Sequence, residues 1–327
     1  MALPPLFERL RAPVMAAPMF IVSSPALVIA QCRAGIVGSM PALNARPQAQ
    51  LGAWLGEIRA ALAAHDAACP DAPAAPFAIN QIAHPSNDRL AEDTATIVEH
   101  RVPIVIISLY ADRAIVDAVH GYGGLVFNDV ISDRQARKAI ANGCDGLIAV
   151  AAGAGGHTGR VSPFALVDEI RAWWDGPLAL SGAIASGRAV LAALAAGADL
   201  AYIGSPFIAT EEANALDEYK ALVTQATSAD IVTTDYFSGV PANFLAGSIT
   251  RAGLDPAKLI RAPDKATNVS PSGDSHRTWR DIWGCGHGVG CITDIVPAVE
   301  RARRLIDEYH AARAAFVRRE PPAAAAH

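Results

Sequence analysis

The residues best suited to chemistry lie in a glycine-rich turn, Ala151-Ala-Gly-Ala-Gly-Gly-His-Thr-Gly159, which carries His157 near its tip. The turn follows the apolar run Gly146–Val150, which predicts a buried strand. Glycine lets a flat ligand approach the backbone without meeting a Cβ, so four glycines within seven residues indicate a ligand-binding surface. Barrel enzymes place catalytic groups just beyond buried strands, and a neutral imidazole is a base near physiological pH. We therefore expect His157 to be catalytic, and the alternative is a flexible turn with an incidental histidine.

The elements that position this turn repeat one βα unit. With helix-like segments between them, the predicted strands span residues 14–19, 35–40, 77–82, 102–109, 123–130, 146–152, 177–184 and 200–208. Glycines 35, 143 and 197 end three of the helices and supply left-handed caps. Eight consecutive units predict an α/β fold, the (β/α)8 TIM barrel, with its ligand site at the carboxyl ends of the strands.

A doubly wound sheet is the alternative fold. It would need Gly-x-Gly-x-x-Gly after the first strand, whereas the glycine cluster follows the sixth strand and has Thr158 in place of the third glycine. We therefore reject a Rossmann nicotinamide site.

The chain divides into a barrel and an insertion. Residues 1–210 and 281–318 form the predicted barrel, which ends in an amphipathic helix over 294–316. Residues 211–280 depart from the repeating rhythm, with a helix expected over 213–227 followed by polar turns. We expect a small helical insertion that covers the barrel mouth, or else a surface appendage. Residues 319–327 are expected to form a flexible tail.

The composition limits the partners and the compartment. Of 327 residues, 52% are hydrophobic and 18% are charged. The acidic and basic residues are interspersed and the net charge is −5, so we expect neither a nucleic-acid nor a membrane partner. Five scattered cysteines without Cys-x-x-Cys, and no apolar signal core in residues 1–11, predict a cytoplasmic protein. Cys285, His287 and Cys291 lack a second pair of ligands, so no metal site is expected. The alanine-rich helices allow a homodimer or packing against the barrel alone.

Two further glycine turns follow the seventh and eighth predicted strands. They are Ser181-Gly-Ala-Ile-Ala-Ser-Gly187 and Gly204-Ser-Pro206. In a barrel these two loops commonly hold a phosphate through backbone N–H groups and a helix amino end. We therefore expect a phosphorylated ligand, with ordinary glycine turns as the alternative.

These segments together resemble the nitronate monooxygenase or 2-nitropropane dioxygenase family of FMN-containing barrels. The other residues that carry the resemblance are Ala17-Pro-Met19, Asn80-Gln81, Ser238-Gly-Val-Pro-Ala242 and Trp283-Gly-Cys-Gly-His-Gly-Val-Gly290. The resemblance runs from about residue 14 to residue 309. It implies FMN held by Ala17, Pro18, Met19, Gln81, Gly155, Gly156, Ser181, Gly182, Gly204, Ser205, Gly286 and Gly288.

The resemblance also implies an activity. Relatives oxidise a nitroalkane or nitronate with O2 to a carbonyl compound and nitrite, and His157 would take the α-proton. A proton beside a nitro group is unusually acidic, so a modest base suffices. The alternatives are an NAD(P)H-dependent FMN reductase of a quinone or an enoyl thioester, which relatives on the same barrel perform, and a flavin-binding protein without turnover.

Some positions depart from the family pattern and leave the substrate open. Asn128-Asp129 ends the fifth strand where many relatives offer a lysine, His287 replaces a glutamine, and Asn243 replaces an arginine. Four aromatic residues are either pocket-lining or core side chains, namely Tyr110, Tyr236, Phe237 and Phe244.

Overall fold

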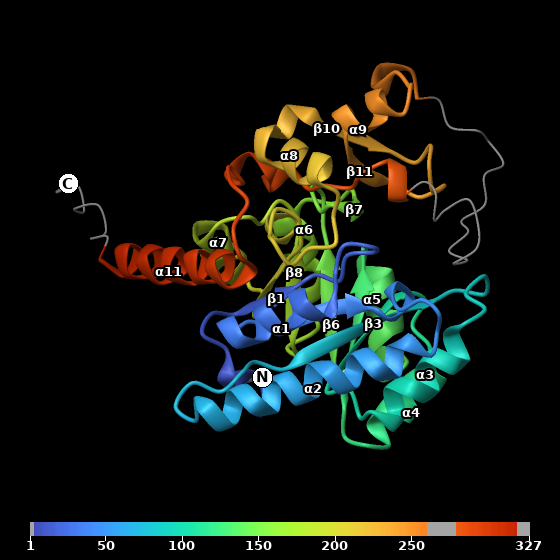
Figure 1. Cartoon of the computed structure of the whole chain (residues 1–327), viewed down its shortest axis with the longest axis vertical. Coiled ribbons are helices and arrows are strands. Elements are labelled where there is room, and N and C mark those ends of the chain that lie inside the picture. Colours follow the sequence, from blue (N-terminus) through green and yellow to red (C-terminus); the bar gives the residue numbers. More distant parts are fainter. Residues whose placement is uncertain (1–2, 260–278, 319–327) are drawn as a thin grey trace.

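Eight parallel strands form a barrel at the centre of the computed structural model, which describes residues 3–259 and 279–318 (Figure 1). Their order is β1-β9-β8-β6-β5-β4-β3-β2. A bridge between Met15 and Val37 joins the two edge strands, and Ala16 N donates to Val37 O at 2.8 Å, so the barrel closes. The strands are β1 (Val14–Ala16), β2 (Gly38–Pro41), β3 (Phe77–Ala83), β4 (Ile104–Leu109), β5 (Leu125–Val130), β6 (Gly146–Val150), β8 (Leu178–Ser181) and β9 (Leu200–Ile203).

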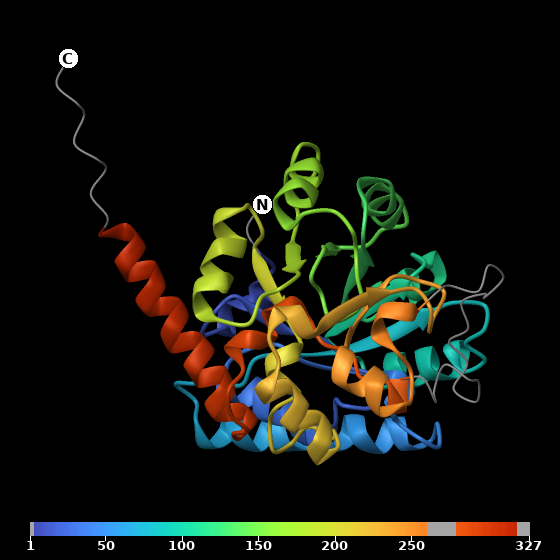
Figure 2. The ribbon, with the colours of Figure 1, turned by 90° about the horizontal axis from the view of Figure 1, so that it is seen from above.

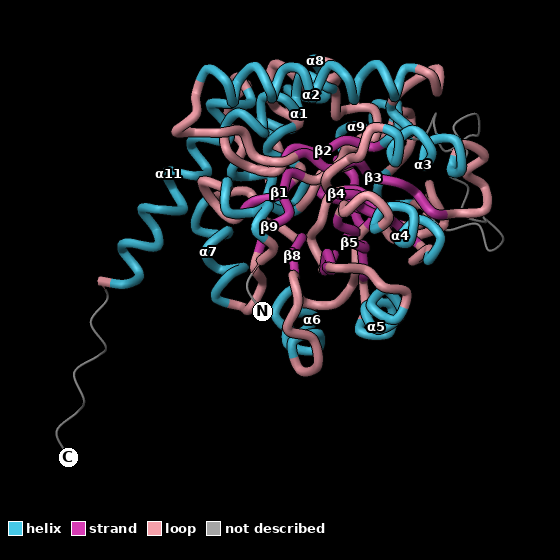
Figure 3. The backbone as a smooth tube through the Cα atoms, turned by 90° about the horizontal axis from the view of Figure 1, so that it is seen from below, coloured by secondary structure: helices cyan, strands magenta, loops and turns pink. Residues whose placement is uncertain are grey.

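Helices surround this barrel (Figures 2 and 3). They are α1 (Pro25–Ala34), α2 (Gln50–Ala68), α3 (Leu90–Glu99), α4 (Arg113–His120), α5 (Asp133–Ala141), α6 (Pro163–Arg171) and α7 (Gly187–Ala195). The last helix, α11 (Ala298–Val317), packs against α7 and α1 and takes the place of the eighth barrel helix. No helix in the described parts of the chain is long and apolar enough to cross a membrane.

Local sequence explains where these elements begin and end. The Oγ atoms of Ser24, Ser132 and Ser186 cap helix amino ends by accepting hydrogen bonds from backbone N–H groups of the first turn. Glycines 35, 143 and 197 have φ of +91°, +91° and +108°, which confirms the predicted caps. Because Gly35 ends α1, the second strand begins at Gly38, later than predicted. The eighth strand ends early, at Ile203, because Ser205–Phe207 forms a 3-10 helix.

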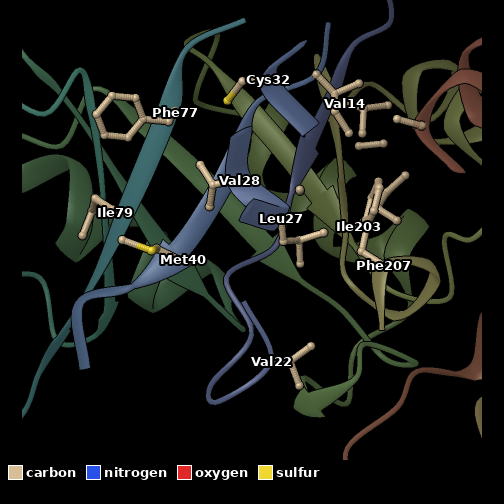
Figure 4. Close-up of a cluster of buried hydrophobic side chains, with 14 of the residues drawn as sticks. Val14, Val22, Leu27, Val28, Cys32, Met40, Phe77, Ile79, Ile203 and Phe207 are labelled. Atoms are coloured by element: carbon tan, nitrogen blue, oxygen red, sulfur yellow. The ribbon is translucent and has the colours of Figure 1, made fainter. Parts of the chain in front are cut away.

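Side chains of each strand alternate between two cores. Met15, Ile106, Phe127 and Ile148 fill the barrel interior, and Phe7 of the 3-10 helix Pro5–Arg9 closes its amino end, with its ring 5.9 Å from that of Phe127. The intervening residues pack outward against the helices, as Val14, Met40, Ile79 and Ile203 do in Figure 4, which also shows Leu27 and Val28 of α1. The parity of a residue along its strand therefore decides whether its side chain can face a site in the barrel mouth.

The insertion predicted over residues 211–280 is not only helical. It contains α8 (Asp217–Gln225) and α9 (Ala246–Arg251), but also the antiparallel strands β10 (Ile231–Thr234) and β11 (Ala242–Leu245). β11 pairs in turn with β7 (Gly156–His157) of the glycine turn. Figure 1 places this small sheet beyond the carboxyl ends of the barrel strands. The polar turns predicted near residue 270 and the tail over 319–327 lie outside the described residues.

Candidate active site

Four glycine-containing segments meet in one pocket at the carboxyl end of the barrel. They come from the turn after β6, the loops after β8 and β9, and the segment before α11. The pocket is lined by Gly153, Ala154, Gly155, Ser181, Gly182, Ala183, Ile184, Tyr202, Gly204, Ser205, Gly286 and Gly288. Most of the residues predicted to bind the cofactor are therefore neighbours in space.

Close packing of backbone on backbone explains several of these glycines. A Cβ on Gly182, where φ is +140°, would lie 2.7 Å from Ala152 O, and one on Gly286 would lie 2.7 Å from Gly153 O. These contacts are shorter than real Cβ atoms tolerate, so any side chain there would push the segments apart. The Gly286 N–H also donates to Ser205 Oγ at 2.9 Å, which ties the last segment to the loop after β9.

The loop after β1 borders the same pocket. A Cβ on Gly204 would meet Ala17 Cβ at 3.4 Å and Met19 Sδ at 3.6 Å, which are ordinary contact distances. Ala17 N donates to Ile203 O at 2.8 Å and continues the pairing of β1 with β9. Ala17 and Met19 therefore lie beside the predicted phosphate loop, as a common cofactor site requires.

Asn44 holds the loop after β1 in place. Its Nδ2 donates to Met19 O at 3.0 Å and to Ser23 O at 2.8 Å, and its Oδ1 accepts from Ile21 N at 2.8 Å. Ile21 has φ of +68°, a conformation that costs a β-branched residue about 1–3 kcal/mol. The Asn44 bonds offset this strain and fix the backbone that adjoins the pocket.

We expect Asn44→Ala to lower the free energy of unfolding by about 2–3 kcal/mol, because three hydrogen bonds are lost in a partly buried loop. Urea unfolding of the two proteins measures this difference. Asn44→Asp keeps an acceptor for Ile21 N but no donors, so its loss should be intermediate. Equal urea midpoints for wild type and Asn44→Ala would contradict the role of this side chain.

The side chain of Gln81 points away from the site, contrary to the prediction. It lies between β3 and α3, where its Nε2 donates to Thr94 Oγ1 at 3.3 Å. Its neighbour Asn80 has the interior parity, and Asn80 Nδ2 donates to Ile106 O at 3.1 Å and to Ser108 Oγ at 2.7 Å. The alternation of β3, in which Ala78 faces inward and Ile79 outward, is the signal that distinguishes the two.

His157 is held by the edge of the small sheet. Its backbone pairs with Ala242 of β11, and its ring makes an edge contact with Trp279 at 5.3 Å between centroids. Nε2 is buried and has no hydrogen-bond partner among the described residues. Burial lowers the pKa of His157 to about 4, so the imidazole is neutral at physiological pH. The ring, two residues from the pocket-lining Gly155, therefore has an unpaired nitrogen that can accept a proton, and burial makes it a weaker base than a free imidazole.

The other residues singled out from the sequence are placed as follows. Phe237 and Phe244 are buried in the hydrophobic core of the insertion with Ile249 and Ile282, so they are core side chains. Tyr110 is 53% exposed and stacks on His84. Cys285 is buried and Cys291 exposed, and no metal-binding group of three His, Cys, Asp or Glu side chains occurs in residues 3–259 and 279–318.

Asp129, which the sequence marks only as a departure from the family pattern, is an interior polar group of the barrel. Asp129 at the end of β5 accepts a hydrogen bond from Ser108 Oγ at 2.5 Å. Burial raises the pKa of Tyr202, and the charge of Asp129 raises it further. Asn128, the other departure at this strand end, faces outward, where its Nδ2 donates to Ile107 O at 2.5 Å. Side chains alternate along β5, and Asp129 lies on the same interior face as Leu125 and Phe127. This alternation is the sequence signal for its interior position.

Comparison with known proteins identifies the family of this chain. The nitronate monooxygenase family model matches residues 6–306. A Mycobacterium tuberculosis protein with a provisional monooxygenase name is 37% identical over 132 residues, which make up 40% of this chain and only 35% of that protein. A nitronate monooxygenase of Paraburkholderia phytofirmans is 28% identical over 307 residues, with 78% of each chain covered.

A solved structure is similar over almost the whole fold. The nitroalkane oxidase of Streptomyces ansochromogenes superposes with a TM-score of 0.76 at 25% identity, covering 96% of this chain and all (100%) of the other. The family match extends from the 3-10 helix before β1 into α11 and thus includes every segment of the pocket. The chain therefore belongs to the nitronate monooxygenase family and is an oxidoreductase.

Proposed function

We propose that this protein oxidises nitronates, and the nitroalkanes from which they form, with O2 to a carbonyl compound and nitrite. The proposed cofactor is FMN and the proposed base is His157. The observation that carries the proposal is the neutral imidazole of His157, whose buried Nε2 has no partner among the described residues, two residues along the chain from Gly155 of the glycine-lined pocket.

The pocket residues fit the phosphate of FMN. Gly182 has a positive φ, and a Cβ there would lie 2.7 Å from Ala152 O. The loops after β8 and β9 bring Ser181, Gly204 and Ser205 to the same pocket. Barrels commonly bind phosphate at these two loops. These residues would hold the phosphate, while Ala17 and Met19 would border the remainder of the cofactor. Bound FMN would supply electron transfer from the nitronate and the reaction with O2.

His157 would remove the α-proton of a neutral nitroalkane. This requires the tautomer with the proton on Nδ1, so that the lone pair of Nε2 is free. Burial disfavours the imidazolium that results, but the nitronate anion formed beside it compensates that charge. A substrate that is already a nitronate needs no base. The role of His157 therefore depends on the ionisation state of the substrate.

Anaerobic mixing tests the proposed function. We expect the purified protein to be yellow and its flavin to be bleached by a nitronate in the absence of NADH and NADPH. Mass spectrometry of the heat-released cofactor should give FMN, because the site offers one phosphate pocket. Bleaching by NADH or NADPH but not by nitronate would instead identify a reductase of a quinone or an enoyl thioester, and bleaching by none of them a flavin-binding protein without turnover.

A further inference from the structure

Asp129 carries a buried oxygen that the described protein residues leave unused. It lies on the interior face at the carboxyl end of β5, where β4 presents Ser108 on one side and β6 presents Ile148 on the other. Oδ2 accepts from Ser108 Oγ at 2.5 Å. Oδ1 is buried and has no hydrogen-bond partner within the described residues.

The direction of the hydrogen bonds fixes the role of each oxygen. Asn80 Nδ2 donates to Ser108 Oγ at 2.7 Å, so the serine uses its own proton toward Asp129. Across the barrel, Tyr202 is the titratable group on β9 whose pKa responds to the charge of Asp129. Tyr202 also lines the glycine pocket. Asp129 therefore has one oxygen that accepts a hydrogen bond from the protein and one that accepts none, and its charge acts on a residue that lines the proposed cofactor site.

An unpaired buried acceptor is costly, and more so when it is charged. Burial raises the pKa of Asp129 to about 6, so above that pH the carboxylate is ionised in the barrel interior. A bound molecule with a hydrogen-bond donor would remove this penalty. Flavin carries such donors in its ring imide N–H and its ribityl hydroxyls.

We propose that Asp129 accepts a hydrogen bond from the bound flavin through Oδ1 and so contributes to flavin affinity. This inference rests on the proposed function, because it takes flavin as the ligand. It assigns a role to a residue that belongs neither to the phosphate loops nor to the proton transfer by His157. The carboxylate form of Asp129 accepts a hydrogen bond from a donor of the flavin. The protonated form instead directs its own O–H donor toward that flavin donor.

Asp129→Asn separates this role from a structural one. The Ser108 hydroxyl needs an acceptor, so the amide oxygen of the new asparagine faces Ser108 and its NH2 group faces the ligand. The variant thus keeps the shape and the internal hydrogen bond while it replaces an acceptor by a donor. It resembles wild type with Asp129 protonated, and it cannot titrate.

The experiment is a fluorescence titration of the full-length apoproteins with riboflavin between pH 5 and pH 8. Riboflavin is the probe because the phosphate of FMN itself titrates near pH 6. His157 remains neutral over this range, since its pKa is about 4. Wild type should bind riboflavin about 10- to 100-fold more tightly at pH 8 than Asp129→Asn does, the range expected for one hydrogen bond to a charged group.

At pH 5 about a tenth of Asp129 is still ionised, so the advantage of wild type should shrink to about 2- to 10-fold, and the affinity of the variant should not change with pH. Equal or tighter binding by Asp129→Asn at pH 8 would overturn the proposal. So would a loss of the same size at pH 5 and pH 8, which indicates a structural role. The same titration with FMN distinguishes failure of the proposed function from failure of this inference. If wild type binds neither riboflavin nor FMN, both are overturned. If wild type binds flavin but its affinity for riboflavin does not depend on pH as described, only the role of Asp129 is overturned.

Discussion

The His157→Asn variant should oxidise a neutral nitroalkane about 10²- to 10⁴-fold more slowly than wild type, because it lacks a positioned base. Oxidation of the preformed nitronate should fall much less, since that substrate has already lost its proton. The β7 backbone pairing with Ala242 does not use the histidine side chain, so the substitution should preserve the sheet. Steady-state rates with both compounds under air, on variant protein shown to contain flavin, measure the difference.

The pH dependence provides the control for this role. Burial lowers the pKa of His157 to about 4, so the base is deprotonated above that value and activity on the nitroalkane should be lost as the pH falls through about 4. The variant should lack this limb of the profile of kcat/KM. Equal rate losses with nitroalkane and nitronate would exclude His157 as the base.

Gly204→Asp should yield protein that folds but retains little flavin. The new Cβ finds only ordinary contacts with Ala17 and Met19, so the loop after β9 can accept it. Its carboxylate, however, would stand where a phosphate is expected. Two like charges about 4 Å apart repel by about 4 kcal/mol at an effective dielectric constant of about 20, which is about a thousandfold in affinity. The ratio of flavin to protein absorbance after purification measures the loss.

Gly204→Ala is the matched control, because it adds the Cβ without the charge. It should retain nearly all the flavin. After flavin is removed from both variants, the two apoproteins should unfold at the same urea concentration, because bound flavin would otherwise stabilise Gly204→Ala alone. Gly182 is a poorer site for this test, because a Cβ there would collide with Ala152 O and disturb the fold itself. Full flavin content in Gly204→Asp would show that the phosphate is held elsewhere.

Much of the fold follows from local patterns in the sequence. Apolar runs and glycine caps repeat along the chain, and each βα unit is specified within about 30 residues of sequence. The glycine loops after β6, β8 and β9 were predicted for the same reason, because the barrel fixes where strand ends lie. Gly286 and Gly288 were placed through resemblance, since their contacts with residues 153–185 join distant parts of the chain.

Other features had no sufficient local signal. Asn80 and Gln81 are both polar residues on a predicted strand, and only the phase of the alternation, fixed by barrel packing, makes Asn80 the interior one. Asp129 looks like a surface residue by hydropathy, yet it lies inside because Ser108 provides a partner. The β-branched run Ile231–Thr234 was a strand signal within a segment expected to be helical. This strand pairs with β11, which pairs in turn with His157. These segments lie far apart in the sequence, so their pairing depends on tertiary structure.

The pairing of β7 with β11 also limits how modular this enzyme is. Gly156 and His157 pair with Asn243 and Ala242 across the two strands. Next to them, Thr158 N donates to Pro241 O at 3.0 Å. The insertion and the histidine are thus parts of one sheet. A chimaera that takes this insertion from a relative must inherit a strand in matching register, or the imidazole loses its alignment even though its own sequence is unchanged. Exchanging the insertion of this barrel is therefore inseparable from redesigning the support of the proposed base.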